Sequence, residues 1–159
     1  MSQPRFAAGD ELPPDLLYAL LKLRVDVFVV EQESPYPDLD GRDLRADTGH
    51  FWWPPTGEPR AYLRLLTEPG GGWRIGRVCT AKEARGEGLG ALLMRTAMAR
   101  VGDDEVVLDA QTYAQRFYAR FGFEPEGEPF DEDGIEHITM RRPARTGRSP
   151  RPPGSARPR

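Results

Sequence analysis

A glycine-rich segment carries the strongest chemical signal in the sequence. It lies between an apolar strand-like run and an amphipathic run, and its glycines are Gly86, Gly88 and Gly90. Glycines at the start of a helix leave its free backbone N–H groups uncovered, and the helix dipole adds positive potential there. Arg85 can add a forked guanidinium. The segment therefore predicts a phosphate-binding site.

Two known glycine-rich phosphate sites fit this segment poorly. A dinucleotide fingerprint would use Gly86, Gly88 and Ala91, with Asp109 as the ribose-binding acid about 20 residues on. However, the run Ala81 to Arg85 separates the preceding strand from the first glycine, and little chain follows Asp109 for a doubly wound sheet. A P-loop is excluded because the sequence contains no Gly-Lys-Ser or Gly-Lys-Thr.

Other reactive residues each allow two interpretations. Tyr118 could donate a proton or pack as a half-buried helix aromatic. Cys79 could carry an acyl group, although a packed strand cysteine is the simpler interpretation. Arg77 could bind a substrate carboxylate or pair with an acid of the chain. The aspartates that follow Pro37 resemble the start of a calcium loop, but Gly41 comes two positions early, so a hydrogen-bonded turn is expected.

Hydrophobic spacing predicts the elements that position these residues. Helices are expected from Asp15 to about Glu31–Glu33, from Leu89 to Val101 and from Tyr113 to Arg120, with Gly122 as the last stop signal. Strands are expected at 50–53, 60–65, 73–80, 105–110, 123–129 and 136–140. This order predicts a mixed α/β (α+β) sheet with helices on its faces.

Composition limits the class of protein. The chain has 159 residues, which suits one domain, expected at 1–142. The tail, 143–159, is rich in arginine and proline and is expected to be disordered. The sequence shows no long apolar span and no secretion signal, and it has one cysteine, so we expect a cytoplasmic protein without membrane association. One cysteine and two histidines exclude a Cys/His zinc cluster, and no metal is expected.

Several motifs in order resemble one superfamily. Arg85-x-x-Gly88-x-Gly90 resembles the pyrophosphate motif of the GCN5-related N-acetyltransferases (GNAT), and the tyrosine before Gly122-Phe123 resembles their second landmark. The segments 23–32, 35–41, 75–78, 110–111 and 132–138 look like the ElaA-like branch of that superfamily. The resemblance extends from about Leu16 to Arg141.

The resemblance implies a GNAT fold, in which a mostly antiparallel sheet contains one parallel strand pair that splays apart to admit acetyl-CoA as co-substrate. Here the pair would be 73–80 and 105–110. Residues on the opening and on the glycine-rich segment would bind the cofactor: Val78, Cys79, Thr80, Arg85, Gly86, Glu87, Gly88, Leu89, Gly90 and Gln111. A backbone N–H near Cys79 would stabilise the oxyanion.

The implied reaction is direct transfer of an acetyl group to an amine, with Tyr118 as the general acid. The amine must lose a proton, and Glu31, His137, Asp109 and Glu136 are the candidate bases. Of these, Glu31 follows an apolar helix face, so burial could raise its pKa, or it could be a surface carboxylate at the end of the helix. His137 could be a base, although a lone histidine in a strand is more often structural. Members of the superfamily have no fixed position for the base, so the resemblance assigns the role of base to none of these four residues.

The acceptor is expected to be a small-molecule or peptide amine, and the acidic first 140 residues could favour a cationic one. The protein is expected to be a monomer or a homodimer. A rival interpretation is a non-catalytic acyl-CoA-binding or sensor module whose basic tail contacts nucleic acid, which we otherwise do not expect as a partner.

Overall fold

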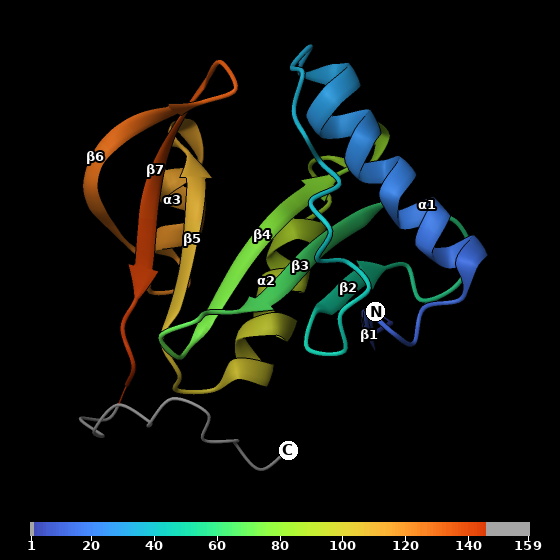
Figure 1. Cartoon of the computed structure of the whole chain (residues 1–159), viewed down its shortest axis with the longest axis horizontal. Coiled ribbons are helices and arrows are strands. Elements are labelled where there is room, and N and C mark those ends of the chain that lie inside the picture. The colour runs from blue at the N-terminus through green and yellow to red at the C-terminus, as the bar shows by residue number, and fades with distance from the viewer. Residues whose placement is uncertain (1, 146–159) are drawn as a thin grey trace.

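The computed structural model describes residues 2–145, and a seven-stranded sheet forms its centre. Helix α1 lies on one face of the sheet, and α2 and α3 lie on the other (Figure 1). The elements in chain order are β1 (Arg5–Ala8), α1 (Pro14–Val25), η1 (Asp26–Glu31), β2 (Gly49–Trp53), β3 (Ala61–Thr67), β4 (Trp73–Thr80), η2 (Lys82–Ala84), α2 (Leu89–Val101), β5 (Val106–Gln111), η3 (Thr112–Ala114), α3 (Gln115–Ala119), β6 (Glu124–Glu132) and β7 (Ile135–Arg142).

The sheet confirms the predicted fold class. Its strand order is β1-β2-β3-β4-β5-β7-β6, and every neighbouring pair is antiparallel except β4 and β5. The parallel pair has only two matched positions, Trp73 with Val106 and Arg74 with Val107. Beyond these positions the two strands diverge toward their carboxyl ends, as Figure 1 shows. The expected splayed pair is therefore present.

A glycine sits where the parallel strands meet. Gly72 has a φ of +82°, and a Cβ there would lie 2.6 Å from the backbone oxygen of Glu105. The N–H of Trp73 donates to that same oxygen at 2.9 Å. Only glycine combines this close approach with the left-handed conformation. Position 72 thus lets β4 and β5 pair at their start before they separate.

Each face of the sheet has its own apolar cluster. On one face, α2 and α3 pack on the strands through residues such as Leu93, Met94 and Leu108. On the other, α1 packs through Leu20, Leu23 and the η1 residue Val27. Burying large aliphatic side chains of this kind contributes roughly 1.5–3 kcal/mol each. The two clusters hold the inner strands while the β4–β5 opening stays clear.

Three details differ from the expectations. Strand β1 was not expected, because four residues carry too little alternation to be recognised. The first α-helix ends at Val25, and the chain continues to Glu31 as a π-helix, within a run rich in β-branched residues. The last helix is shorter than expected, with five residues following a 3₁₀ turn.

No helix within residues 2–145 has the length and apolar character needed to cross a bilayer. Most of the expected arginine-rich tail, at 146–159, lies outside the described residues.

Candidate active site

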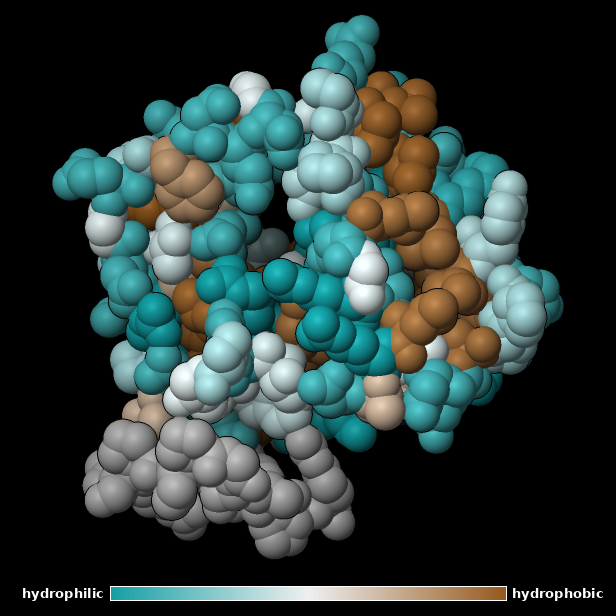
Figure 2. Space-filling view, in the orientation of Figure 1, coloured by the Kyte–Doolittle hydropathy of each residue, from teal (hydrophilic) through white to brown (hydrophobic). Residues whose placement is uncertain are grey.

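A cleft of about 1230 Å³ occupies the opening between β4 and β5. Its walls include the ends of both strands, the end of η1, the glycine-rich segment and the start of α3. Figure 2 shows it as a hollow between the α1 side and the β5–β7 side of the molecule. The cleft therefore lies in the part of the sheet where β4 and β5 are no longer hydrogen-bonded to each other.

The glycine-rich segment forms one end of this cleft. Gly86 and Gly88 have φ values of +87° and +78°, and a Cβ at either would meet nothing within 4 Å. Helix α2 begins at the next residue, Leu89, with no side chain capping its free N–H groups. Gly90 differs from them, because a Cβ there would lie in contact with the Phe117 ring at 3.4 Å. The start of α2 thus presents uncovered N–H groups beside the cleft, as an anion site requires.

Nine of the ten expected cofactor-binding residues line the cleft. They are Val78, Cys79, Thr80, Arg85, Gly86, Gly88, Leu89, Gly90 and Gln111. Glu87 does not line it, and its carboxylate pairs with Arg60 at 3.2 Å. The cleft thus contains residues from both diverging strands and from the glycine-rich segment.

Arg85 and Glu31 form an ion pair at the cleft. The guanidinium of Arg85 donates to both carboxylate oxygens of Glu31, at 2.5 and 2.6 Å. Its Nε also donates to the backbone oxygen of Thr80 at 3.2 Å. The hydrogen bonds from Arg85 lower the pKa of Glu31. The interpretation of Glu31 as a buried carboxylate with a raised pKa was therefore wrong, whereas its alternative, a surface carboxylate, agrees with the exposed side chain. The partner arginine could not be recognised because it is 54 residues away in the sequence.

Strand β4 has a bulge beside the opening. Tyr62 pairs with Cys79 but Arg64 pairs with Gly76, so Arg77 and Val78 together face one residue of β3. Arg77 has a φ of +55°, which is unusual for a residue with a side chain. The bulge ends at Cys79, which packs beneath α1, and burial raises the pKa of its thiol to about 12. A protonated, packed thiol favours the structural interpretation of this cysteine.

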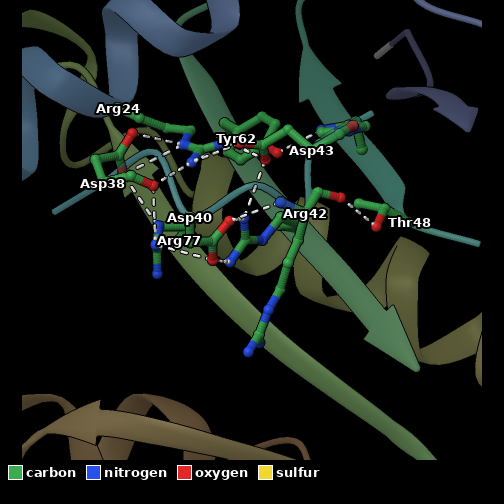
Figure 3. Close-up of polar contacts among 10 residues, drawn as sticks. Arg24, Asp38, Asp40, Arg42, Asp43, Thr48, Tyr62 and Arg77 are labelled. Carbon is green, nitrogen blue, oxygen red and sulfur yellow. Dashed lines mark hydrogen bonds and ion pairs between the residues drawn. The ribbon is translucent and has the colours of Figure 1, made fainter. Parts of the chain in front are cut away.

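A buried ion network holds this bulge (Figure 3). Arg77 donates to a carboxylate oxygen of Asp38 at 3.0 Å and to its backbone oxygen at 2.9 Å. Arg24, which is fully buried, donates to the same carboxylate at 3.0 Å and to Asp43 at 2.6 Å. Arg77 also lies 4.8 Å from the centre of the Tyr36 ring. The interpretation of Arg77 as the partner of an acid therefore fits the structure.

Arg64 completes the network from β3. It donates to both oxygens of Asp40, at 2.9 and 2.7 Å, and to Asp43 at 3.0 Å. Burial alone would raise the pKa of Asp40, but the hydrogen bonds and charge of Arg64 hold it well below its usual range. The aspartates that resembled a calcium loop thus bind arginines. Among residues 2–145 no group of three or more His, Cys, Asp or Glu side chains is placed to hold a metal ion.

This network was not predicted, although two signals in the sequence pointed to it. Arg24 stands at the helical spacing of the buried Leu20 and Val27, where an apolar residue would be expected. Arg64 alternates in phase with Tyr62, which is fully buried. A cation at a core position requires a buried acid, and the aspartates of the 35–43 loop were the available candidates.

Tyr118 reaches the cleft from α3. Its ring packs edge-on against Phe117 at 5.0 Å and Phe123 at 6.3 Å, and the residue is 9% exposed. Burial raises the pKa of its hydroxyl above the usual value. A hydroxyl in this setting keeps its proton at neutral pH, as a proton donor must.

The four candidate bases have different surroundings. Asp109 accepts from Arg74 at 3.0 Å and from Thr139 at 2.8 Å, while Glu31 is held by Arg85. Glu136 is exposed, accepts from Thr112 and does not line the cleft. His137 does line it.

One ring nitrogen of His137 is hydrogen-bonded to the backbone. Its Nδ1 lies 2.8 Å from the backbone oxygen of Ile135, and a carbonyl only accepts, so Nδ1 carries the hydrogen. Its Nε2 lies 3.5 Å from the Glu132 carboxylate. Asp109 and Glu31 are ion-paired with arginines, whereas His137 lines the cleft beside a carboxylate.

Comparison with known proteins agrees with this geometry. Residues 56–143 match the family model described as an acetyltransferase (GNAT) domain. The chain belongs to the GNAT acyltransferase family. A UPF0039 protein of Mycobacterium tuberculosis is 51% identical over 89% of this chain and 93% of its own length.

Solved structures confirm the GNAT fold and the resemblance to the ElaA-like branch. The crystal structure of Escherichia coli ElaA has a TM-score of 0.80 and 42% identity, covering 89% of this chain and 99% of its own. An acyl-CoA N-acyltransferase from Pseudomonas aeruginosa also has a TM-score of 0.80, with 44% identity over 88% of this chain and 98% of its own.

Proposed function

We propose that this GNAT protein transfers an acetyl group from acetyl-CoA to an amine by direct transfer in a ternary complex. The observation that carries the proposal is the shared cleft, which contains the uncovered start of α2, the unpaired edge of β4, Tyr118 and His137. We also propose a cytoplasmic location, which suits the single buried thiol of Cys79.

The donor would bind along the opening. Its pyrophosphate would accept hydrogen bonds from the N–H groups of residues 85–90. Its pantetheine arm would pair like an added strand with Val78–Thr80, because β5 has diverged from β4 there. Arg85 is bound to Glu31 and to the backbone oxygen of Thr80, so it would help donor binding by holding the segment that follows Thr80 in place.

The chemical step would then need two proton transfers. The amine nitrogen attacks the thioester carbon, so a C–N bond forms while the C–S bond breaks. A backbone N–H near Cys79 would stabilise the transient oxyanion. His137 Nε2 would take the proton lost by the amine, and the nearby Glu132 carboxylate would stabilise the resulting imidazolium. Tyr118 would give its proton to the departing thiolate of CoA, and solvent would restore both groups.

The first experiment is a calorimetric titration of the protein with acetyl-CoA, with CoA and NAD as comparison ligands. Micromolar binding of acetyl-CoA without binding of NAD supports the assigned cofactor. An amine panel, with release of the CoA thiol as the readout, then tests transfer. Absence of acetyl-CoA binding would refute the proposal. Binding without transfer to any amine would favour the non-catalytic binding module.

A second experiment tests the role of Tyr118. Tyr118→Phe removes only the hydroxyl, so we expect kcat to fall roughly 10²–10⁴-fold, the usual contribution of a general acid, with the Kd for CoA nearly unchanged. Tyr18→Phe is the matched control, because Tyr18 is 73% exposed on α1 and lies outside the cleft. Equal turnover in Tyr118→Phe and the wild type would refute the assignment.

A further inference from the structure

The cleft residues of the 40–48 loop, of β3 and of the start of β4 form what we call the acceptor wall, and the carboxylates in and beside it are already bonded. Arg74 donates to both Glu68 and Asp109. Asp40 accepts from Arg64 and Arg77. Each of these acids therefore has an arginine partner, although Glu68 and Asp109 share one arginine.

Two cations of the same wall have no such partner. Arg42 and Arg45 line the cleft and are exposed, and neither guanidinium has an ion pair or hydrogen bond within residues 2–145. The remaining acid on this wall, Asp47, accepts from the hydroxyl of Thr67 at 3.1 Å. Since the other arginines of this wall, Arg64 and Arg74, are ion-paired, Arg42 and Arg45 are its arginines with a guanidinium free to bind a ligand.

The backbone of Arg42 is held in place. Its N–H donates to Asp40 at 3.1 Å, and its carbonyl oxygen accepts from the Thr48 hydroxyl at 2.7 Å. Asp40 is itself fixed by Arg64. In Figure 3 the side chain of Arg42 extends away from the ion network, and no dashed line reaches its guanidinium. A pinned backbone with a free guanidinium at its end is suited to recognising a ligand from outside the chain.

We propose that the acceptor is a small amine that also carries a carboxylate, and that Arg42 binds this carboxylate. The inference rests on the proposed acetyl transfer and names its acceptor class. A guanidinium presents paired N–H donors that match the two oxygens of a carboxylate. Binding at that end would leave the amine of the acceptor free to enter the opening between β4 and β5. Arg45, beside Arg42, would add attraction at the mouth.

The test uses matched amines, because the distance between the acceptor's amine and its carboxylate is the unknown. The series is glycine, β-alanine, γ-aminobutyrate and ε-aminohexanoate, each compared with its carboxamide. Acetyl-CoA-dependent transfer is measured for the wild type, Arg42→Gln and Arg42→Lys. Arg95→Gln is the control, because Arg95 is exposed on α2 and lies outside the cleft.

For at least one chain length, we expect the carboxylate to exceed its carboxamide about 10- to 100-fold in kcat/KM, as a charge-assisted hydrogen bond would give. Arg42→Gln should remove this preference and leave the carboxamide rates unchanged. Arg42→Lys should restore part of it, and Arg95→Gln should behave as the wild type.

Two results would overturn the inference. One is equal rates for each carboxylate and its carboxamide, including the case in which acetyl-CoA binds but none of these carboxylates reacts. The other is an Arg42→Gln variant that slows both members of a pair equally. Failure to bind acetyl-CoA would instead refute the proposed function itself.

Discussion

The substitution Asp38→Asn isolates the charge at the centre of the buried network. The side chain of Asp38 is 2% exposed and accepts from both Arg24 and Arg77. Asparagine has nearly the same shape but only one acceptor atom. If its oxygen stays toward Arg77, its NH₂ group faces the Nε of Arg24, where the carboxylate oxygen lies at 3.0 Å. The substitution therefore replaces an ion pair with two opposed donors while changing little volume.

The expected cost follows from what Arg24 retains. Removing one partner of a buried ion pair costs roughly 3–5 kcal/mol, because the remaining charge is left uncompensated. Arg24 keeps Asp43 at 2.6 Å, so the lower end of that range applies, about 3 kcal/mol. This corresponds to a roughly 150-fold change in the unfolding equilibrium. With an m-value of about 2 kcal/mol/M, the urea midpoint should fall by about 1.5 M.

The assay is urea unfolding followed by tryptophan fluorescence, for which the buried Trp52 is a suitable reporter. The matched control is Asp26→Asn, since Asp26 also pairs with a cation, Lys22, but both side chains are more than half exposed. We expect its midpoint to move several-fold less. If Asp38→Asn shifts the midpoint no more than Asp26→Asn does, the charge of Asp38 does not contribute the expected stability.

Two further predictions concern the histidines. His137→Gln should lower kcat with the Kd for acetyl-CoA nearly unchanged, because the imidazole that would take the amine proton is gone; a kcat equal to that of the wild type would exclude His137 as the base. The buried ring of His50 hydrogen-bonds to Tyr62 and to the backbone oxygen of Asp43, and burial lowers its pKa. The unfolded chain then binds the proton more readily, so the free energy of unfolding should fall as pH drops below about 6.5, by up to about 1.4 kcal/mol per pH unit. Urea midpoints between pH 7.5 and 5.5 measure this, with His50→Gln expected to flatten the slope; an equally steep slope in His50→Gln would contradict it.

The fold was largely predictable because its signals are local. Alternation and length marked six of the seven strands, and Gly86, Gly88 and Gly90 marked the start of α2. Strand β1 gave no such signal, because its four residues are specified by pairing with β2 and not by their own pattern. The change from α-helix to π-helix at Asp26 was also invisible, since spacing alone does not separate the two.

The candidate site was less predictable because its electrostatics depend on distant partners. From the sequence, Glu31 could be a buried base or a surface carboxylate, and the structure places Arg85 against it. Sequence separation conceals such a pair, and the pair reverses the direction of the pKa shift. Arg77 had two interpretations for the same reason, and the position of Asp38 favours one of them.

The ion network contacts both the donor-binding edge of β4 and the wall of the cleft that contains Arg42. Through Asp38 and Asp40 it holds Arg77, whose positive φ creates the β4 bulge beside the donor. Through the same Asp40 it fixes the backbone N–H of Arg42 on the acceptor wall. A bulge residue in a sparsely populated conformation persists only when its surroundings over-determine it. Removing Asp38 should therefore loosen the bulge and the donor edge of β4, while Arg64 still holds Asp40 and Arg42 in place.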